Sequence, residues 1–305
     1  MNIETLHQEL EELFPEMVDI RRDLHQHPEL SFQEFNTAKK IADYLTELGI
    51  EVRTEVGGRG VVGLLRGKKE GKTVALRADF DALPIQDEKD VPYKSTVPGV
   101  MHACGHDGHT ATLLGVAKVL AKHRDELEGN VVFIHQHAEE LTPGGAKPMI
   151  EDGCLDGVDV IFGSHLDSMS PSGHIKYREG YIMAASDGFE ITISGKGGHG
   201  AAPHDTVDPL VTASQLVTNL QQIVSRNVDP VKSAVLTIGS FHSGDANNVI
   251  PDTAKITGTV RTYDPEVREL IQKRMKQVAD ATCLANGATC EVTADMFQQM
   301  LNFNL

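Results

Sequence analysis

The chain has 305 residues, of which 40% are hydrophobic and 24% are charged, a balance typical of globular proteins. Its formal net charge of −16 argues against a nucleic-acid partner, because phosphate binding needs a basic surface. The sequence contains no run of about 18 apolar residues and no apolar segment after Met1, so it predicts neither a membrane span nor a secretory signal. The four cysteines are far apart, which fits a reducing compartment, and we expect a cytoplasmic protein.

The first part of the chain alternates between helix and strand patterns. Apolar spacing predicts three helices, which lie within residues 6–24, 38–48 and 110–122. Pro15 is expected to interrupt and restart the first helix, and Gly49 to end the second. Short apolar runs predict four buried strands, at residues 61–65, 74–76, 131–134 and 158–162. This alternation predicts an α/β domain with a mostly parallel sheet.

The pattern changes near residue 185, where a second set of elements begins. These are predicted in the order strand 189–193, helix 210–220, strands 234–241 and 254–263, helix 265–286 and strand 290–292. The order β-α-β-β-α-β is the ferredoxin-like motif, which by itself indicates no function. We therefore expect one domain over residues 1–183 and a second, α+β domain over residues 184–296.

Side chains that can bind metal follow three of the predicted strands. They are Asp79 and Asp81, Glu139 and Glu140, and His165. In open α/β sheets, ligands bind at the carboxyl ends of the strands, so these side chains are expected at one edge. Cys104 and His106 come just before a helix, and an extended backbone would turn both to the same side. Cys, His and Glu together suit zinc, manganese, cobalt or nickel.

Six motifs give the sequence a specific resemblance. ALRADFDALPI, MHACGHDGHTA, HAEE, GSHLD, GKGGHGAAPH and NNVIPD resemble, in this order, the motifs of the aminoacylase-like metallopeptidase family. The nearest branch holds hippurate hydrolases, N-acyl-L-amino acid amidohydrolases, N-acetyldiaminopimelate deacetylases and plant IAA-amino acid hydrolases. The resemblance covers residues 15–295. It implies a metallo-amidohydrolase acting on small N-acyl-amino acids, and a homodimer formed through residues 184–296 as an inserted lid.

The resemblance also implies roles for individual residues. The ligands of two divalent ions (manganese, zinc, cobalt or nickel) would be Cys104, His106, Glu140 and His165. Glu139 would be the general base, and Asp81 would orient a ligand or the base. The substrate would be contacted by His199, Asn248 and Arg261. Chemistry agrees with this division, since a bound divalent ion acidifies water and a nearby carboxylate can then take the proton.

Structural roles compete with several of these assignments. Cys104 alone fits a packed thiol, His165 a buried histidine, and Asp79 or Asp81 a residue that fixes a loop. Asn248 and Arg261 fit a turn and a solvated strand. Asp107 is expected to cap the helix that begins near residue 110. Four further histidines could support the metal or the core: His102, His109, His135 and His137.

The resemblance stops at Met296, and residues 297–305 form a divergent tail. Members of the family continue with a segment that completes the first domain and carries a further ligand histidine. We therefore expect a C-terminally truncated chain that is poorly stable and hydrolyses its substrate more slowly than a complete relative. Two alternatives stay open, a non-catalytic remnant that binds metal and dimerises, and a dipeptidase.

Overall fold

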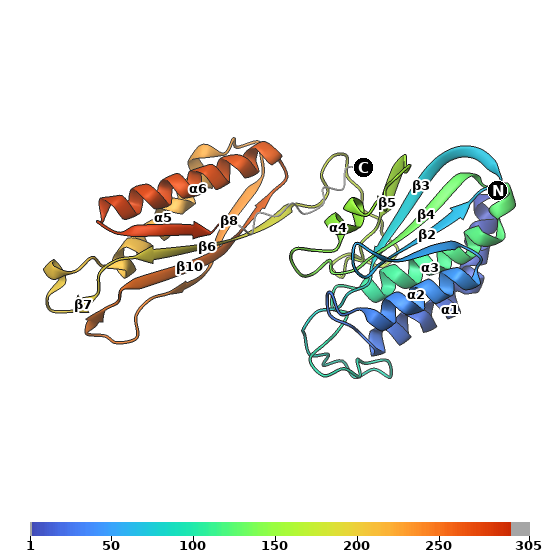
Figure 1. Cartoon of the computed structure of the whole chain (residues 1–305), viewed down its shortest axis with the longest axis horizontal. Helices are drawn as coiled ribbons and strands as arrows, with labels where there is room; N and C mark the ends of the chain where they lie inside the picture. The colour runs from blue at the N-terminus through green and yellow to red at the C-terminus, as the bar shows by residue number, and fades with distance from the viewer. Residues whose placement is uncertain (1, 294–305) are drawn as a thin grey trace. The chain divides into compact units, whose positions relative to one another are not determined.

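The computed structural model describes residues 2–293 (Figure 1). The chain divides into two compact units, Met1–Ile175 and a second that starts at Lys176. This division lies a few residues before the boundary expected at 183/184. The tail expected at 297–305 lies outside the described residues. Within the described part, no helix is long and apolar enough to cross a bilayer.

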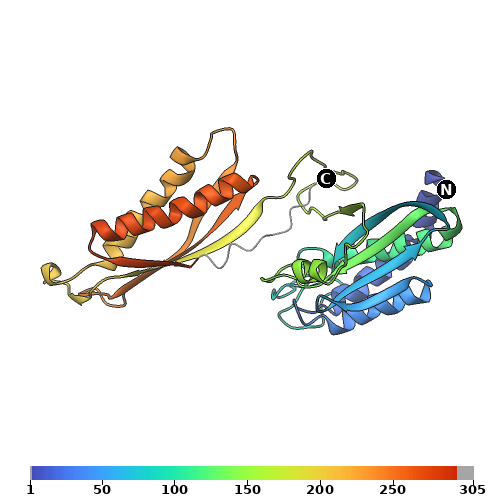
Figure 2. The same ribbon diagram turned by 45° about the horizontal axis from the view of Figure 1, so that its top comes forward.

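Three long helices of the first unit pack on one face of its sheet (Figures 1 and 2). They are α1 (Ile3–Gln26), α2 (Phe35–Glu47) and α3 (His106–Lys122). The shorter α4 (Ala146–Glu151) packs its Met149 against the opposite face. The restart expected at Pro15 is wrong, because α1 is continuous through it. A proline removes one backbone hydrogen bond, and the packing of α1 along α3 holds the helix together across that gap.

The sheet of the first unit is mixed, which corrects the expectation of a mostly parallel sheet. Its strands are β1 (Glu51–Val56), β2 (Gly60–Arg66), β3 (Lys69–Asp79), β4 (Glu128–Gln136) and β5 (Val160–Gly163). Their order is β1-β2-β4-β3-β5, with antiparallel pairing on the β1–β2–β4 side. The pairs β3–β4 and β3–β5 are parallel, so these three strands do end at the same edge of the sheet.

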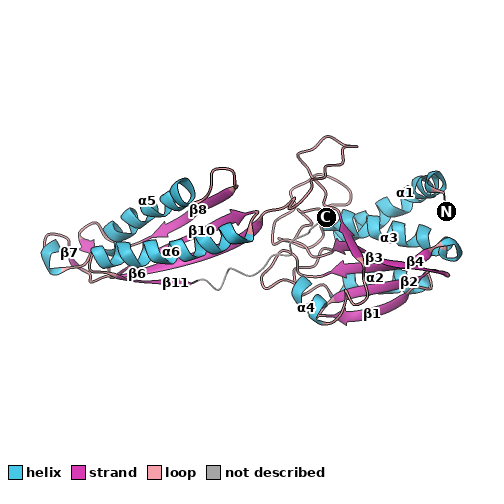
Figure 3. Cartoon of the chain, turned by 90° about the horizontal axis from the view of Figure 1, so that it is seen from above, coloured by secondary structure: helices cyan, strands magenta, loops and turns pink. Residues whose placement is uncertain are grey.

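The second unit has the predicted β-α-β-β-α-β order (Figure 3). Its elements are β6 (Ala185–Ser194), α5 (Pro209–Asn227), β8 (Ala234–His242), β10 (Thr253–Thr262), α6 (Pro265–Ala285) and β11 (Thr289–Thr293). The strands form an antiparallel sheet in the order β11-β6-β10-β8, the ferredoxin-like arrangement. Both helices bury their apolar sides against one face of this sheet. A separate two-stranded ribbon joins β7 (Gly198–His199) to β9 (Val249–Ile250).

Candidate metal centre

His106 is the residue around which the candidate centre is built. It is the first residue of α3 and is fully buried, and Gly105 before it adopts a left-handed conformation (φ +89°). The expected extended backbone between Cys104 and His106 is therefore wrong, because the turn at Gly105 brings the two side chains together instead. Nδ1 of His106 donates to the backbone oxygen of Asp81 at 2.9 Å and approaches its carboxylate at 3.2 Å. In the neutral ring, the lone pair of His106 is consequently on Nε2.

Three carboxylates face the Nε2 atom of His106. The distances from this atom are 3.6 Å to Asp79, 4.0 Å to Glu139 and 3.7 Å to Glu140. Neither His106 Nε2 nor Glu140 Oε1 has a hydrogen-bond partner among the described residues, although both atoms are buried. Donors that are each about 2.1 Å from one ion lie about 3–4 Å from each other. The arrangement of these donors therefore fits a divalent cation.

Cys104 and His165 lie close to each other and to His106. The Sγ of Cys104 lies 3.3 Å from Nε2 of His165. The donor atoms of Cys104, His106 and His165 lie within 4.8 Å of one another, as do those of His106, Glu139 and Glu140. The four residues expected to bind metal thus fall in two overlapping groups that share His106. His106 has a single free lone pair, on Nε2, so it can serve as a ligand in only one of the two groups at a time.

The electrostatics of the centre favour a bound positive charge. Burial acts to lower the pKa of His106, but its hydrogen bond to Asp81 and the surrounding carboxylates raise that pKa to about 11. Burial, with the charges of Asp79 and Glu140, raises the pKa of Glu139. Both pKa values are raised, and both shifts reflect an excess of negative charge in a poorly solvated site. A proton or a metal ion can neutralise this charge.

Asp81 connects several parts of the centre. Besides His106, its carboxylate accepts hydrogen bonds from the Ser31 hydroxyl at 2.7 Å and from the backbone N–H of Glu140 at 3.0 Å. Burial opposes its ionisation, but the hydrogen bonds, that of His106 first, hold the pKa of Asp81 below its usual range. These contacts are the ones that an orienting residue requires.

A second buried carboxyl group supports the loop after β4. Glu34 Oε1 accepts the backbone N–H of Ala138 at 2.8 Å, and Ala138 has a positive φ of 48°. Ala138 immediately precedes Glu139, so this bond helps to set the direction of the loop that carries Glu139. Sequence reasoning missed both Glu34 and Ser31. They lie in an irregular turn before α2, where nothing in the pattern distinguishes them from surface residues.

The capping role expected for Asp107 is wrong. The helix begins at His106, so Asp107 lies inside its first turn, where it accepts hydrogen bonds from His25 at 2.8 Å and Arg21 at 3.1 Å. His102 and His135 are buried without a hydrogen-bond partner among the described residues. Burial lowers the pKa of His102 to about 4 and that of His135 to about 3, so both rings are neutral near pH 7.

In the second unit, the structure brings His199 and Asn248 together but not Arg261. His199 is on β7, and the following residue, Gly200, donates its backbone N–H to the backbone oxygen of Asn248 at 2.8 Å. Arg261 pairs with residues of β6 and β8 near the far end of β10. A strand rises about 3.3 Å per residue, so Arg261 lies about 26 Å along β10 from Thr253, which is near the His199 ribbon.

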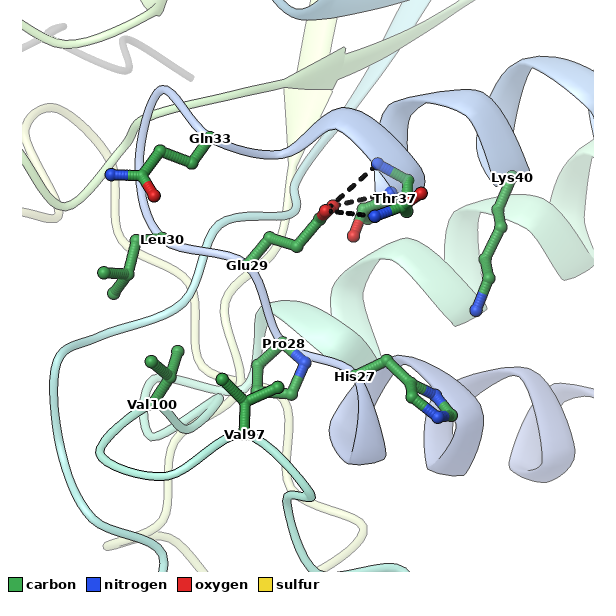
Figure 4. A pocket seen from close by; sticks show the side chains of 10 residues that line it. His27, Pro28, Glu29, Leu30, Gln33, Thr37, Lys40, Val97 and Val100 are labelled. Atoms are coloured by element: carbon green, nitrogen blue, oxygen red, sulfur yellow. Dashed lines mark hydrogen bonds between the residues drawn. The ribbon is translucent and has the colours of Figure 1, made fainter.

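A cavity of about 560 Å³ lies beside the turn between α1 and α2, and it contains none of the predicted site residues. Figure 4 shows Glu29 pointing from this turn towards the start of α2. Both of its carboxylate oxygens accept hydrogen bonds there, from Asn36 and from the backbone N–H of Thr37. Glu29 therefore caps the first turn of this helix.

Comparison with known proteins identifies the family. Residues 75–297 match the model of peptidase family M20/M25/M40. The putative amidohydrolase YhaA of Bacillus subtilis (strain 168) is 58% identical over 297 residues, which are 96% of this chain and 75% of that protein. The N-acyl-L-amino acid amidohydrolase of Geobacillus stearothermophilus is 45% identical over 305 residues, which are 100% of this chain and 82% of that protein.

A solved structure agrees with the sequence relatives. The YXEP protein of Bacillus subtilis, described as a dinuclear metal binding peptidase from the M20 family, has a TM-score of 0.79 and 41% sequence identity. The match covers 93% of this chain and 74% of that chain. The resemblance predicted from the motifs is thereby confirmed, and this chain belongs to peptidase family M20/M25/M40.

Proposed function

We propose that this protein is a metal-dependent amidohydrolase that cleaves the amide bond of N-acyl-amino acids. The observation that carries the proposal is the buried Nε2 of His106, which faces three carboxylates without a hydrogen-bond partner among the described residues. The printed names of two relatives, an N-acyl-L-amino acid amidohydrolase and a putative amidohydrolase, support this substrate class. Hydrolysis of acetyl or benzoyl derivatives fits the proposal equally.

The proposed ligands are Cys104, His106, Glu140 and His165, which would hold two divalent ions such as manganese, zinc, cobalt or nickel. The description of the YXEP protein as dinuclear supports the number of ions. When bound, these ions supply the Lewis acidity that acidifies water and polarises the amide carbonyl. Asp81 fixes the tautomer of His106 through Nδ1, so that Nε2 keeps its lone pair for binding.

Glu139 is proposed as the general base. Its neighbour Glu140 has its backbone tied to Asp81, whereas no hydrogen bond commits the carboxylate of Glu139 elsewhere among the contacts described above. The raised pKa of Glu139 helps it to accept a proton from the attacking water. It then passes this proton to the amine nitrogen as the C–N bond breaks, which regenerates the carboxylate.

For the second unit, we propose the role of a lid and dimerisation domain over residues 184–296, with residues 1–183 as the catalytic domain. His199 Nδ1 accepts the N–H of Ala201 at 3.0 Å, so its proton sits on Nε2 and can be donated to an anionic substrate. Asn248 lies beside it, and Arg261 is proposed as a further substrate contact. The edge strands β8 and β11 offer surfaces for a two-fold dimer.

The test uses the whole chain, stripped of metal and then supplied with zinc or manganese. We expect hydrolysis of N-acetyl- or N-benzoyl-amino acids in preference to dipeptides. Glu139→Gln should keep its metal and lose about 10²–10⁴-fold in rate. The matched variant Glu140→Gln should lose metal affinity instead. If Glu139→Gln lost its metal and Glu140→Gln kept it, the two roles would be assigned wrongly. Metal binding without hydrolysis would favour a non-catalytic protein. Faster cleavage of dipeptides would favour a dipeptidase.

A further inference from the structure

The imidazole of His109, on α3, is buried, and both of its ring nitrogens are engaged in hydrogen bonds. Nδ1 lies 2.6 Å from the Asp79 carboxylate, and Nε2 lies 2.8 Å from the backbone nitrogen of Leu166. A backbone N–H can only donate, and an ionised carboxylate can only accept. The ring proton is therefore on Nδ1, and the lone pair on Nε2 is used by Leu166. Although His109 lies close to Asp79 and His106, it has no lone pair left for a metal ion.

The backbone of Leu166 in turn determines the orientation of His165. Nδ1 of His165 donates to the Leu166 carbonyl at 2.7 Å. The proton of this ring is consequently on Nδ1, and its Nε2 faces the Cys104 sulfur. Strand β5 ends at Gly163, so no strand pairing holds the segment that carries His165. Its position depends on local contacts.

The side chain of Leu166 adds a third contact, although more than half of its surface is exposed (55%). It lies over two glycines at the start of α3. A Cβ atom on Gly108 would be 2.6 Å from Leu166 Cδ1, and one on Gly105 would be 3.2 Å from it. The absence of side chains at these two positions lets Leu166 approach the helix closely enough for its N–H to reach His109.

We propose that His109 is a positioning residue that holds Leu166 and thereby aims Nε2 of His165 at the Cys104–His106 group. Asp79 orients His109, and its other oxygen is held by Arg77 at 2.6 Å. The inference rests on the proposed function, because it explains how one proposed ligand is held in place. Residues that orient a metal-binding histidine in this way typically contribute about 10–100-fold to metal affinity.

Two substitutions in the full chain separate the two hydrogen bonds of His109. In His109→Gln, the amide oxygen replaces Nε2 and can still accept the N–H of Leu166. In His109→Asn, the shorter amide can still donate to Asp79 but cannot reach Leu166. His123→Asn is the matched control, because the described hydrogen bonds of the His123 side chain go to Glu9 and Glu126, at the opposite end of α3. Thermal unfolding of the metal-free variants checks that each one folds.

The first measurement is the affinity for Co²⁺ alone, followed by the thiolate-to-cobalt absorption of Cys104. We expect His109→Asn to lose about 10–100-fold in affinity, and the Gln variant and the His123 control to stay near the unsubstituted protein. Equal affinity of the Asn variant and the unsubstituted protein would overturn the inference.

The second measurement is ¹⁵N NMR of the metal-free protein, which reports the tautomer of each histidine ring. We expect Nδ1 of both His109 and His165 to carry a proton, and the Nδ1–H of His165 to lose its hydrogen bond to the Leu166 carbonyl in His109→Asn only. A proton on Nε2 of His109, or an unchanged His165 in that variant, would refute the positioning role. If the unsubstituted protein binds no Co²⁺, the proposed function fails, while the tautomers still decide whether His109 positions His165.

Discussion

Replacing Glu34 by glutamine should change how the stability of the protein depends on pH. The Glu34 side chain is fully buried, and its Oε2 has no hydrogen-bond partner among the described residues. Burial is the main cause that raises its pKa from 4.5 to about 7, and the charge of Asp81 adds to it, against the opposing hydrogen bond from Ala138. Between these two pH values the folded protein keeps a proton that the unfolded chain releases.

The sign of the effect follows from this difference. The protonated carboxyl group stabilises the fold fully below about pH 4.5, and this contribution is lost as the pH rises to about 7. Each pH unit between the unfolded and folded pKa values changes the free energy of unfolding by about 1.4 kcal/mol, so the stability lost between pH 5 and pH 8 is about 2–3 kcal/mol. Glutamine keeps an oxygen for Ala138 and has no proton to lose. The free energy of unfolding of Glu34→Gln, relative to that of the unsubstituted protein, should therefore rise by about 2–3 kcal/mol from pH 5 to pH 8.

The assay is urea unfolding of the metal-free protein and of Glu34→Gln at several pH values from about 5 to about 8. Glu47→Gln serves as the control, because Glu47 is an exposed residue on α2. The difference in unfolding free energy between the two proteins should grow with pH for Glu34 and stay constant for Glu47. A constant difference for Glu34 would refute the reasoning, because it would mean that Glu34 ionises equally in the folded and unfolded chains.

Three further predictions concern packing, charge and assembly. Gly129→Ala should lower the free energy of unfolding by more than about 2 kcal/mol, because φ is +84° and the new Cβ would meet a backbone oxygen at 1.9 Å. Gly157→Ala should lower it by only about 1 kcal/mol, because φ is +73° but the space around the new Cβ is open. Equal losses of stability in thermal unfolding would contradict this reasoning. Asp187→Ala should destabilise the protein by about 1.5–3 kcal/mol in urea, since it removes the hydrogen bonds between this buried carboxylate and the Arg268 guanidinium. An unchanged midpoint would show that the pair contributes nothing. The protein should sediment as a dimer at micromolar concentration, and a strict monomer would count against the proposed role of the second unit.

Most helices and strands were predictable because their patterns are local. The apolar periodicity of residues 110–122 and the short runs in β2 and β4 reflect which side of each element is buried. β1 was missed because Glu51–Val56 is mostly exposed and polar, and it becomes a strand by pairing with β2. The predicted direction of strand pairing was also wrong in part, since β1, β2 and β4 pair antiparallel, and this direction depends on how distant segments of the chain meet.

Glu139, Glu140 and His165 could be predicted from their positions after strands, Cys104 and His106 from theirs before a helix, and the ferredoxin-like order from periodicity alone. Tertiary structure decided which atoms face each other, and it leaves Arg261 far along the sheet from His199. Contacts such as Glu34 with Ala138, 104 positions apart, and Asp79 with His109 are made between segments that meet only in the folded chain. Periodicity reports which side of an element is buried, whereas the partner of a buried polar group depends on the packing of several elements, so no local pattern reveals it.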